Sequence, residues 1–187
     1  MTPPVRARPT APLLAGCAVV LALAPTPAGA ATIHGTAGDD RIYGTHRADT
    51  IRSRLGDDRV WARGGNDAIS GAAGNDRLDG GWGNDRLGGA RGNDVIGGGP
   101  GNDTVSSGPG DDTVTGGTGH DKVNLGPGVD TVDGGEGRDF LQGLDDADVI
   151  HGGPGDDRGP APAQPGTDRD AYLLGGGGPD RLYGDGG

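Results

Sequence analysis

A single aliphatic residue returns every nine positions along most of this chain, and polar or small residues flank it on both sides. The triplet Arg86–Leu87–Gly88 is an example, with one apolar residue between two that can face solvent. Such triplets predict short strands that alternate out, in and out. The aliphatic series runs through Ile42, Ile51, Val60, Ile69, Leu78, Leu87, Ile96, Val105, Val114, Val123, Val132, Leu141 and Ile150. A period kept this strictly predicts a chain that coils with a fixed step, not an ordinary globular core.

Glycine-rich segments with an aspartate separate these triplets. The chain runs in one register from Gly35 to Arg158, and the fourth of each nine positions is glycine in twelve of fourteen copies, the exceptions being Arg47 and Asp146. Glycine is typical of tight turns that need a positive φ or a close backbone approach. The sixth position is always aspartate: Asp40, Asp49, Asp58, Asp67, Asp76, Asp85, Asp94, Asp103, Asp112, Asp121, Asp130, Asp139, Asp148 and Asp157. Collagen needs glycine at every third position and is excluded, because the seventh position is never glycine through Val149.

Two stretches show the full nonapeptide: GGWGNDRLG at residues 80–88 and GGPGNDTVS at residues 98–106. The pattern GGxGxDxUx resembles the calcium-binding repeats of RTX proteins, also called hemolysin-type calcium-binding repeats. The resemblance covers nearly the whole chain after residue 30. It implies an all-β fold, a parallel β-roll (a right-handed β-solenoid) with two nonapeptide repeats per coil and calcium held between the turns of neighbouring coils.

The donor atoms of these turns are carboxylates and backbone carbonyls, an all-oxygen set that suits calcium better than magnesium. The chain offers little to softer metals, since its four histidines are scattered (His34, His46, His120, His151) and interpreted as surface residues. The aspartates predicted to bind calcium are Asp40, Asp58, Asp67, Asp76, Asp85, Asp94, Asp103, Asp112, Asp121, Asp130, Asp139, Asp157 and Asp180.

Composition agrees with a fold that needs cations. The 187 residues have room for one domain, but 43 are glycine, only 31% are hydrophobic and 3% are aromatic. That composition alone favours disorder, and the strict repeat overrides it. The formal net charge of −11 predicts that the chain avoids nucleic acid and anionic membranes and attracts cations. We therefore expect folding to depend on calcium.

If two repeats make one coil, aspartates 18 residues apart lie on one edge. The Asp49 row (Asp49, Asp67, Asp85, Asp103, Asp121, Asp139, Asp157) has full GGxGxD turns from Asp85 onward. Turns of the opposite row, such as SGPGDD and LGPGVD, lack a glycine. We expect Asp103 and Asp121 to matter more for calcium affinity than Asp112 and Asp130; neutral drift in glycine content is the alternative.

The first turns depart further from the repeat. GTHRAD, SRLGDD and ARGGND are expected to bind calcium weakly or to form a partial cap. Arg41, Arg59 and Arg77 also recur every 18 residues and should align on one outer face. The simpler interpretation is that they offset the acidic turns, and docking of an acidic partner is the alternative.

Residues 1–30 have the features of a secretory signal peptide. Arg6 and Arg8 precede an apolar run, and Ala28 and Ala30 form a small-x-small cleavage signal, so cleavage is expected after Ala30 and the product is expected to be extracellular. The apolar run is too short to span a membrane. The sequence around Cys17 resembles a lipobox, which leaves lipoprotein processing as an alternative. Removal of Cys17, the only cysteine, would exclude a stabilising disulfide.

The sequence thus predicts a signal peptide (1–30), a β-roll (31–158), a proline-rich loop (159–170) and a terminal repeat (171–187) that contains Asp180 and Leu182. The chain ends in an unfinished turn, so end-to-end self-association is expected to be open to it.

No serine elbow, metalloprotease helix or paired catalytic constellation occurs in the sequence. The predicted function is a secreted, non-enzymatic calcium-binding β-roll. A calcium-rigidified adhesin or surface-assembly component is the alternative, and a role as the accessory module of an enzyme is a weaker one. Ice binding needs a threonine array, and Thr113–Val114–Thr115 is the only such triplet.

Overall fold

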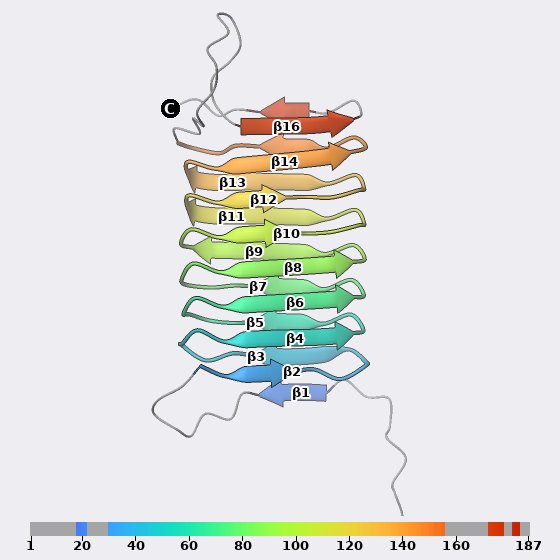
Figure 1. Cartoon of the computed structure of the whole chain (residues 1–187), viewed down its shortest axis with the longest axis vertical. Coiled ribbons are helices and arrows are strands. Elements are labelled where there is room, and N and C mark those ends of the chain that lie inside the picture. Colours follow the sequence, from blue (N-terminus) through green and yellow to red (C-terminus); the bar gives the residue numbers. More distant parts are fainter. Residues whose placement is uncertain (1–17, 22–29, 156–171, 178–180, 184–187) are drawn as a thin grey trace, which may run out of the picture.

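The structure is a computed structural model that describes residues 18–21, 30–155, 172–177 and 181–183. Within these residues the chain forms 17 strands and no helix. The strands alternate between two layers, one behind the other in Figure 1, and the stack grows along one axis from blue to red. The arrangement is a parallel β-solenoid, as the sequence predicted. The described residues contain no helix that is long and apolar enough to cross a bilayer.

The odd-numbered strands form one nine-stranded sheet, in sequence order. These strands are β1 (Ala18–Leu21), β3 (Asp40–Tyr43), β5 (Arg59–Trp61), β7 (Arg77–Asp79), β9 (Val95–Pro100), β11 (Thr113–Gly119), β13 (Thr131–Gly137), β15 (Val149–His151) and β17 (Arg181–Tyr183). The even-numbered strands form an eight-stranded sheet. They are β2 (Thr32–His34), β4 (Thr50–Leu55), β6 (Ala68–Ala73), β8 (Arg86–Arg91), β10 (Thr104–Ser106), β12 (Lys122–Asn124), β14 (Phe140–Asp145) and β16 (Tyr172–Gly177).

All strand pairs are parallel, and from β2 to β15 paired residues lie 18 positions apart. Val105, for example, pairs with Leu87 on one side and with Val123 on the other. Beyond residue 155 the register continues after an insertion, because Ile150 pairs with Leu182. At the other end, β1 lies beside β3 although it belongs to the predicted signal segment. Cleavage of that segment stays a prediction.

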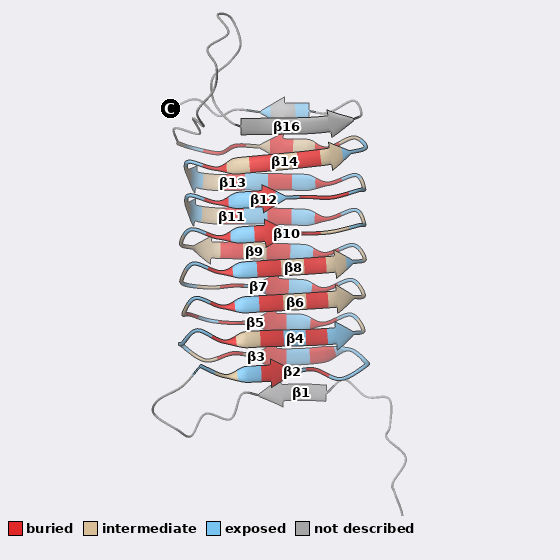
Figure 2. Cartoon of the chain, in the orientation of Figure 1, coloured by how far each residue is buried: buried red, intermediate tan, exposed pale blue. Residues whose placement is uncertain are grey.

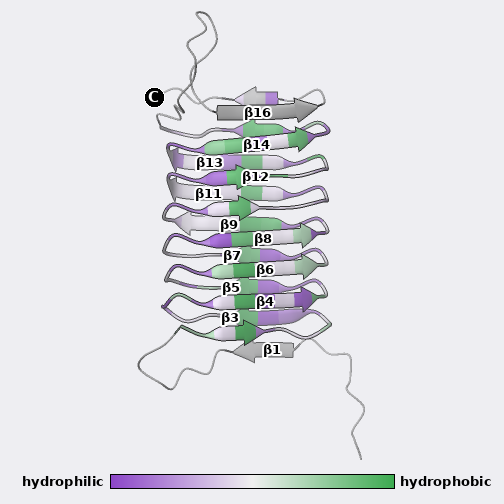
Figure 3. Ribbon diagram, in the orientation of Figure 1, coloured by the Kyte–Doolittle hydropathy of each residue, from purple (hydrophilic) through white to green (hydrophobic). Residues whose placement is uncertain are grey.

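The core is a double column of aliphatic side chains between the sheets. Short strands such as β7, β10 and β12 have the predicted out-in-out burial, and the thirteen predicted inward residues are at most 4% exposed. Figure 2 shows this buried band, and Figure 3 shows that its strand centres are the hydrophobic positions. Ala62 and Leu125, at the first position of their repeats, also join the core. Neither residue was predicted to be in the core, because both lie outside the strand triplets.

The backbone conformation of the turns explains why glycine recurs at fixed positions of the repeat. The second and fourth positions of most repeats have positive φ, where a side chain is strained. At the fourth position Gly101 also packs against the chain below, so that an added Cβ would collide with the Gly83 carbonyl oxygen. At the second position Ala72 and Ala90 adopt φ of 80° despite their Cβ. Where alanine replaces glycine at the second position of the Asp40 row, the turn therefore keeps its shape at a conformational cost.

Candidate metal-binding turns

The aspartates form two ladders along the two edges of the solenoid. In each ladder the backbone N–H of one aspartate donates to Oδ1 of the aspartate 18 positions later, as from Asp103 to Asp121 at 2.7 Å and from Asp94 to Asp112 at 2.7 Å. The Asp49 row comprises Asp49, Asp67, Asp85, Asp103, Asp121 and Asp139. The Asp40 row comprises Asp40, Asp58, Asp76, Asp94, Asp112, Asp130 and Asp148.

Along most of the two ladders the second carboxylate oxygen has no hydrogen-bond partner in the described structure. This holds for Oδ2 at nine consecutive copies: Asp58, Asp67, Asp76, Asp85, Asp94, Asp103, Asp112, Asp121 and Asp130. All nine side chains are at most 2% exposed. Burying a carboxylate oxygen without a partner is expensive, so an extended series of such atoms indicates a missing positive group.

The first-position glycines make room for the second oxygen. A Cβ added to Gly98 would contact Asp103 Oδ2 and would lie 2.6 Å from the Gly116 carbonyl oxygen. A Cβ added to Gly116 would lie 2.6 Å from Asp121 Oδ2 and would contact the Gly134 carbonyl oxygen. Carboxylate and carbonyl oxygens therefore approach each other from consecutive coils, which is the kind of donor set that calcium prefers.

Burial also changes the protonation of these aspartates. Desolvation, with a smaller contribution from neighbouring carboxylates, raises the pKa of Asp67, Asp76, Asp121 and Asp130 to about 7. The same causes raise the pKa of Asp94 and Asp103 to about 6. The pKa values of Asp58, Asp85 and Asp112 are raised as well, with burial as the main cause. The turns thus disfavour free negative charge and favour either protons or cations.

In the first two turns a threonine donates hydrogen bonds to Oδ2 of the aspartate. The Thr36 backbone N–H and hydroxyl donate to Oδ2 of Asp40 at 2.5 and 3.1 Å. Thr45 does the same for Asp49 at 2.6 and 3.0 Å. Threonine donors therefore occupy the oxygen that is left without a partner from Asp58 to Asp130.

Of the three turns expected to bind weakly or to form a partial cap, only GTHRAD with Asp49 has such a donor, whereas SRLGDD and ARGGND leave Oδ2 of Asp58 and Asp67 without a partner. Asp40, which was predicted to be a ligand, has a threonine donor as well.

A second, exposed ladder runs beside each aspartate row, at the fifth position of the repeats. On one edge the N–H of Asn102 donates to Asn84 Oδ1 at 2.7 Å, and the N–H of His120 donates to Asn102 Oδ1 at 2.7 Å. On the other edge Asn75 donates to Asp57 Oδ1 at 2.7 Å. The sequence analysis missed these residues. The repeated Asn-Asp and Asp-Asp pairs were the available signal.

At some copies the two aspartate rows differ in what fills the first position of the turn, although Gly71 and Gly89 keep glycine there in the Asp40 row. Gly98 and Gly116 precede Asp103 and Asp121 in the Asp49 row, whereas Ser107 precedes Asp112 in the Asp40 row. The Ser107 hydroxyl donates to the Leu125 carbonyl oxygen at 2.7 Å and so occupies an oxygen of the turn. Leu125, which precedes Asp130, places a buried aliphatic side chain there.

Other metal chemistry finds little support in the described part of the chain. No group of three or more His, Cys, Asp or Glu side chains there gathers closely enough to hold an ion, so any site must include backbone oxygens. Three of the four histidines are exposed, and His151 stacks on Tyr183 with ring centroids 4.5 Å apart. The predicted ligands Asp157 and Asp180 lie outside the described residues, as do Cys17 and the whole of the predicted proline-rich loop (159–170).

Comparison with known families shows which family the repeats match. The family model of the RTX calcium-binding nonapeptide repeat (4 copies) matches residues 28–60, 47–78, 61–96, 97–132, 125–158 and 165–187. These segments include every aspartate and every inward aliphatic residue described above. No curated protein matches the chain.

Proposed function

The chain belongs to the RTX calcium-binding nonapeptide repeat family, and from this we propose that it is a secreted, non-enzymatic calcium-binding β-roll that folds as it binds calcium. We further propose that two nonapeptide repeats make one coil, which the 18-residue offset between paired strands supports. Calcium would lie between the turns of successive coils and would hold the two edges of the solenoid together.

The observation that carries this proposal is the series of buried Oδ2 atoms without a partner, from Asp58 to Asp130. A divalent cation would supply the missing positive charge, with one ion shared between stacked turns. The proposed ligands in the described residues are those aspartates and Asp139, together with carbonyl oxygens of the glycine turns. Calcium accepts this flexible set of oxygens, whereas magnesium requires a nearly ideal octahedron.

The proposal excludes catalysis by these carboxylates. General acids and nucleophiles need a reacting group within reach, whereas Oδ1 of each ladder aspartate is engaged by a backbone N–H and Oδ2 is buried. Secretion rests on the signal features of residues 1–30, with cleavage after Ala30, and calcium concentrations outside cells would favour the folded form.

Calcium titration of the purified chain tests the proposed function. We expect far-UV circular dichroism of the metal-free protein to change to a β spectrum when calcium is added, with heat of binding in calorimetry and release by a chelator. Magnesium at the same concentration is the control and should have much less effect. An unchanged spectrum together with no heat of calcium binding would contradict the proposal.

A further inference from the structure

The outer face of the even-numbered sheet is basic, although the chain as a whole is acidic. On β2, β4, β6, β8, β10, β12 and β14, neither residue beside the inward aliphatic side chain is Asp or Glu. The same positions include Arg52, Arg86 and Lys122. The odd-numbered sheet differs, because Asp79 on β7 and Asp133 on β13 occupy the corresponding positions. An anion that approaches the even-numbered sheet therefore meets cations without opposing carboxylates at these positions.

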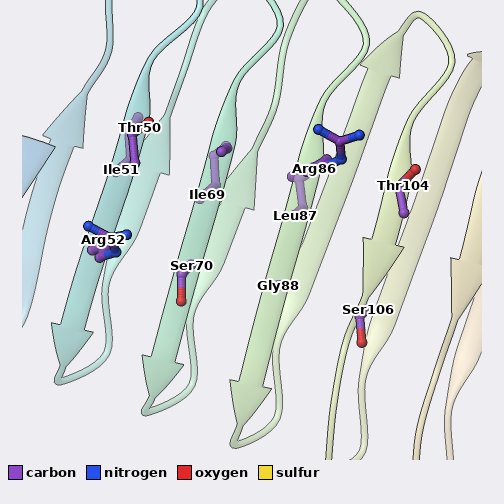
Figure 4. Close-up of a pocket in the computed structure, with 11 residues that line it drawn as sticks. Thr50, Ile51, Arg52, Ile69, Ser70, Arg86, Leu87, Gly88, Thr104 and Ser106 are labelled. Carbon is purple, nitrogen blue, oxygen red and sulfur yellow. The ribbon is translucent and has the colours of Figure 1, made fainter. Parts of the chain in front are cut away.

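A shallow hollow of about 320 Å³ lies on this face and spans β4, β6, β8 and β10. Figure 4 shows one row of its lining, Arg52, Ser70, Gly88 and Ser106, which crosses these strands. Among the described residues that line the hollow, Arg52 and Arg86 carry charge and none is acidic. The lining contains four hydroxyl groups, which belong to Thr50, Ser70, Thr104 and Ser106. The hollow thus combines positive charge with hydrogen-bond donors.

The aspartates that precede these strands do not line the hollow. Asp67 and Asp85 stand directly before Ala68 and Arg86 in the sequence, but they are 2% and 1% exposed and belong to the Asp49 row. In the calcium-loaded protein the proposed ions would neutralise them. The positive charge of the hollow therefore remains available to a ligand.

The two arginines stand at opposite corners of the hollow. Arg52 pairs with Ser70 and Arg86 pairs with Ala68, so the two arginines flank β6 from either side. A strand spacing of about 4.8 Å and a rise of about 3.3 Å per residue place their Cα atoms about 12 Å apart. The midpoint lies over β6, where the outward residues Ala68 and Ser70 are small. Two long side chains can therefore reach one ligand group from opposite sides.

The structure leaves both guanidinium groups and the space between them open. Neither Arg52 nor Arg86 forms an ion pair or a side-chain hydrogen bond with another described residue. Gly88 lacks a positive φ, and an added Cβ would meet only the carbonyl oxygens of Ile69 and Ser106, at 3.9 and 4.0 Å. The backbone therefore does not require glycine at this strand position. A glycine inside a strand weakens it and is typical of places where a ligand approaches closely.

We propose that this hollow binds a phosphomonoester group, as a phosphorylated sugar carries. Such a group is close to dianionic at neutral pH and has three strong acceptor oxygens. The guanidinium groups of Arg52 and Arg86 can each donate paired hydrogen bonds to these oxygens. The hydroxyls of Ser70 and Ser106 can donate to the phosphate or to the sugar.

Other ligands use the hollow less completely. A neutral sugar leaves both guanidinium groups without an anion, and a carboxylate brings one charge and two oxygens to two arginines. A single-stranded nucleic acid gains affinity from bases that stack on aromatic rings, and the described lining contains none. A lipid headgroup can carry the same phosphomonoester, so the experiment separates a soluble source from a membrane source.

The experiment follows the backbone amide signals of the calcium-loaded full chain by nuclear magnetic resonance while glucose 6-phosphate is added in excess calcium. We expect saturable shifts at Ser70, Gly88 and Ser106. Glucose should cause no such shifts, and glucuronate should bind more weakly than the phosphate ester. Vesicles of phosphatidate in phosphatidylcholine form the membrane arm of the test.

Two charge variants test the role of the arginines. Arg52→Gln/Arg86→Gln should weaken binding of glucose 6-phosphate at least about tenfold, because both charged donors are lost. Arg59→Gln/Arg77→Gln is the control, since it removes the same charge from the opposite sheet, where the two arginines pair beside Asp57. It should change the affinity less than about twofold.

Two glycine variants test the role of the open space. Gly88→Ile should fill the hollow and weaken binding at least about tenfold, while isoleucine suits a strand better than glycine does. Gly97→Ile is the control, because Gly97 occupies the same repeat position on the odd-numbered sheet and an added Cβ there meets nothing within 4 Å. All four variants should keep the circular dichroism spectrum of the calcium-loaded protein.

Several outcomes would overturn the proposal. These are no saturable shift with glucose 6-phosphate, equal losses in the two arginine variants, undiminished binding in Gly88→Ile, and binding of the vesicles without binding of the soluble ester. Shifts confined to the aspartate turns would also overturn it, since the phosphate would then contact calcium. Calcium-dependent folding is measured on the same samples, so a chain that folds with calcium but ignores the ester rejects only this inference.

Discussion

The sixth-position aspartate is the residue on which the solenoid depends. Its Oδ1 accepts the backbone N–H of the preceding coil, as Asp121 does from Asp103, and from Asp58 to Asp130 its Oδ2 is buried without a hydrogen bond. The first oxygen therefore fixes the spacing between coils, and the second oxygen creates the demand for a cation. An asparagine could perform the first role but would supply no charge for the second.

The raised pKa values predict how the metal-free chain responds to pH. A folded-state pKa of about 7 at Asp67, Asp76 and Asp121 lies above the ordinary value of 3.8, so the protonated form favours folding. This stabilisation is complete below the ordinary pKa and is lost as the pH rises through about 7. We expect metal-free protein to gain β structure between pH 8 and pH 5.5, measured by far-UV circular dichroism.

With saturating calcium the same measurement should show the opposite trend, because calcium requires ionised carboxylates and competes with protons. A metal-free chain with as much β structure at pH 8 as at pH 5.5 would contradict the assignment of these pKa values to the stacked aspartates.

Strain at Ala90 gives a second prediction at the residue scale. Its φ of 80° lies in the left-handed region, which costs an alanine about 1–2 kcal/mol and costs a glycine almost nothing. We expect Ala90→Gly to raise the free energy of unfolding by about 1 kcal/mol, after allowance for the greater freedom of glycine in the unfolded chain. Denaturant unfolding in excess calcium measures this change.

Ala73→Gly is the control, since Ala73 lies in the same kind of turn without a positive φ. It should lower the stability slightly or leave it unchanged. An equal gain in both variants would mean that backbone strain is not what distinguishes the second position.

At the scale of elements, a turn combines an inner aspartate ladder with an outer ladder at the fifth position. The outer ladder, as between Asn84 and Asn102, involves only neutral or exposed groups and needs no metal. In the inner ladder Oδ2 has no hydrogen-bond partner from Asp58 to Asp130, whereas Thr36 and Thr45 donate to this oxygen in the first two turns. The turns along one edge are therefore not equivalent, although their backbone paths are alike.

The two aspartate rows should bind calcium with unequal strength. We expect Asp103→Asn/Asp121→Asn to reduce calcium affinity more than Asp112→Asn/Asp130→Asn. Glycines precede the first pair, whereas Ser107 and Leu125 occupy the corresponding space beside the second. Asparagine keeps the Oδ1 acceptor, so the ladder hydrogen bond survives in both variants.

Calcium titration by calorimetry, with circular dichroism to confirm folding, compares the two double variants. Equal losses of calcium affinity in the two double variants would show that the first-position residue does not control how tightly the site binds calcium. The replacement of glycine in the Asp40 row would then reflect neutral variation.

At the scale of the whole molecule, burial changes the charge that partners encounter. The chain carries a formal charge of −11, which by itself predicts an acidic surface. Most aspartates of the first half are buried in the ladders, where calcium would neutralise them, and the arginines of that half all remain exposed. The solenoid therefore has a basic half and an acidic half, and net charge alone is a poor guide to its partners.

The nine-residue period determined a large part of this protein from sequence alone. Strand triplets, inward aliphatic residues and the alignment of Arg41, Arg59 and Arg77 follow from local periodicity, because each coil repeats the same backbone path. The threonines that satisfy Asp40 and Asp49 lie only four residues before them, so the departure of Thr36 and Thr45 from glycine was a signal within one repeat. The tertiary structure alone decided which carboxylate oxygen lacks a partner and that Leu125 joins the core. These features depend on how neighbouring coils stack, which brings together residues 18 apart, and a pattern within one repeat contains no information about that contact.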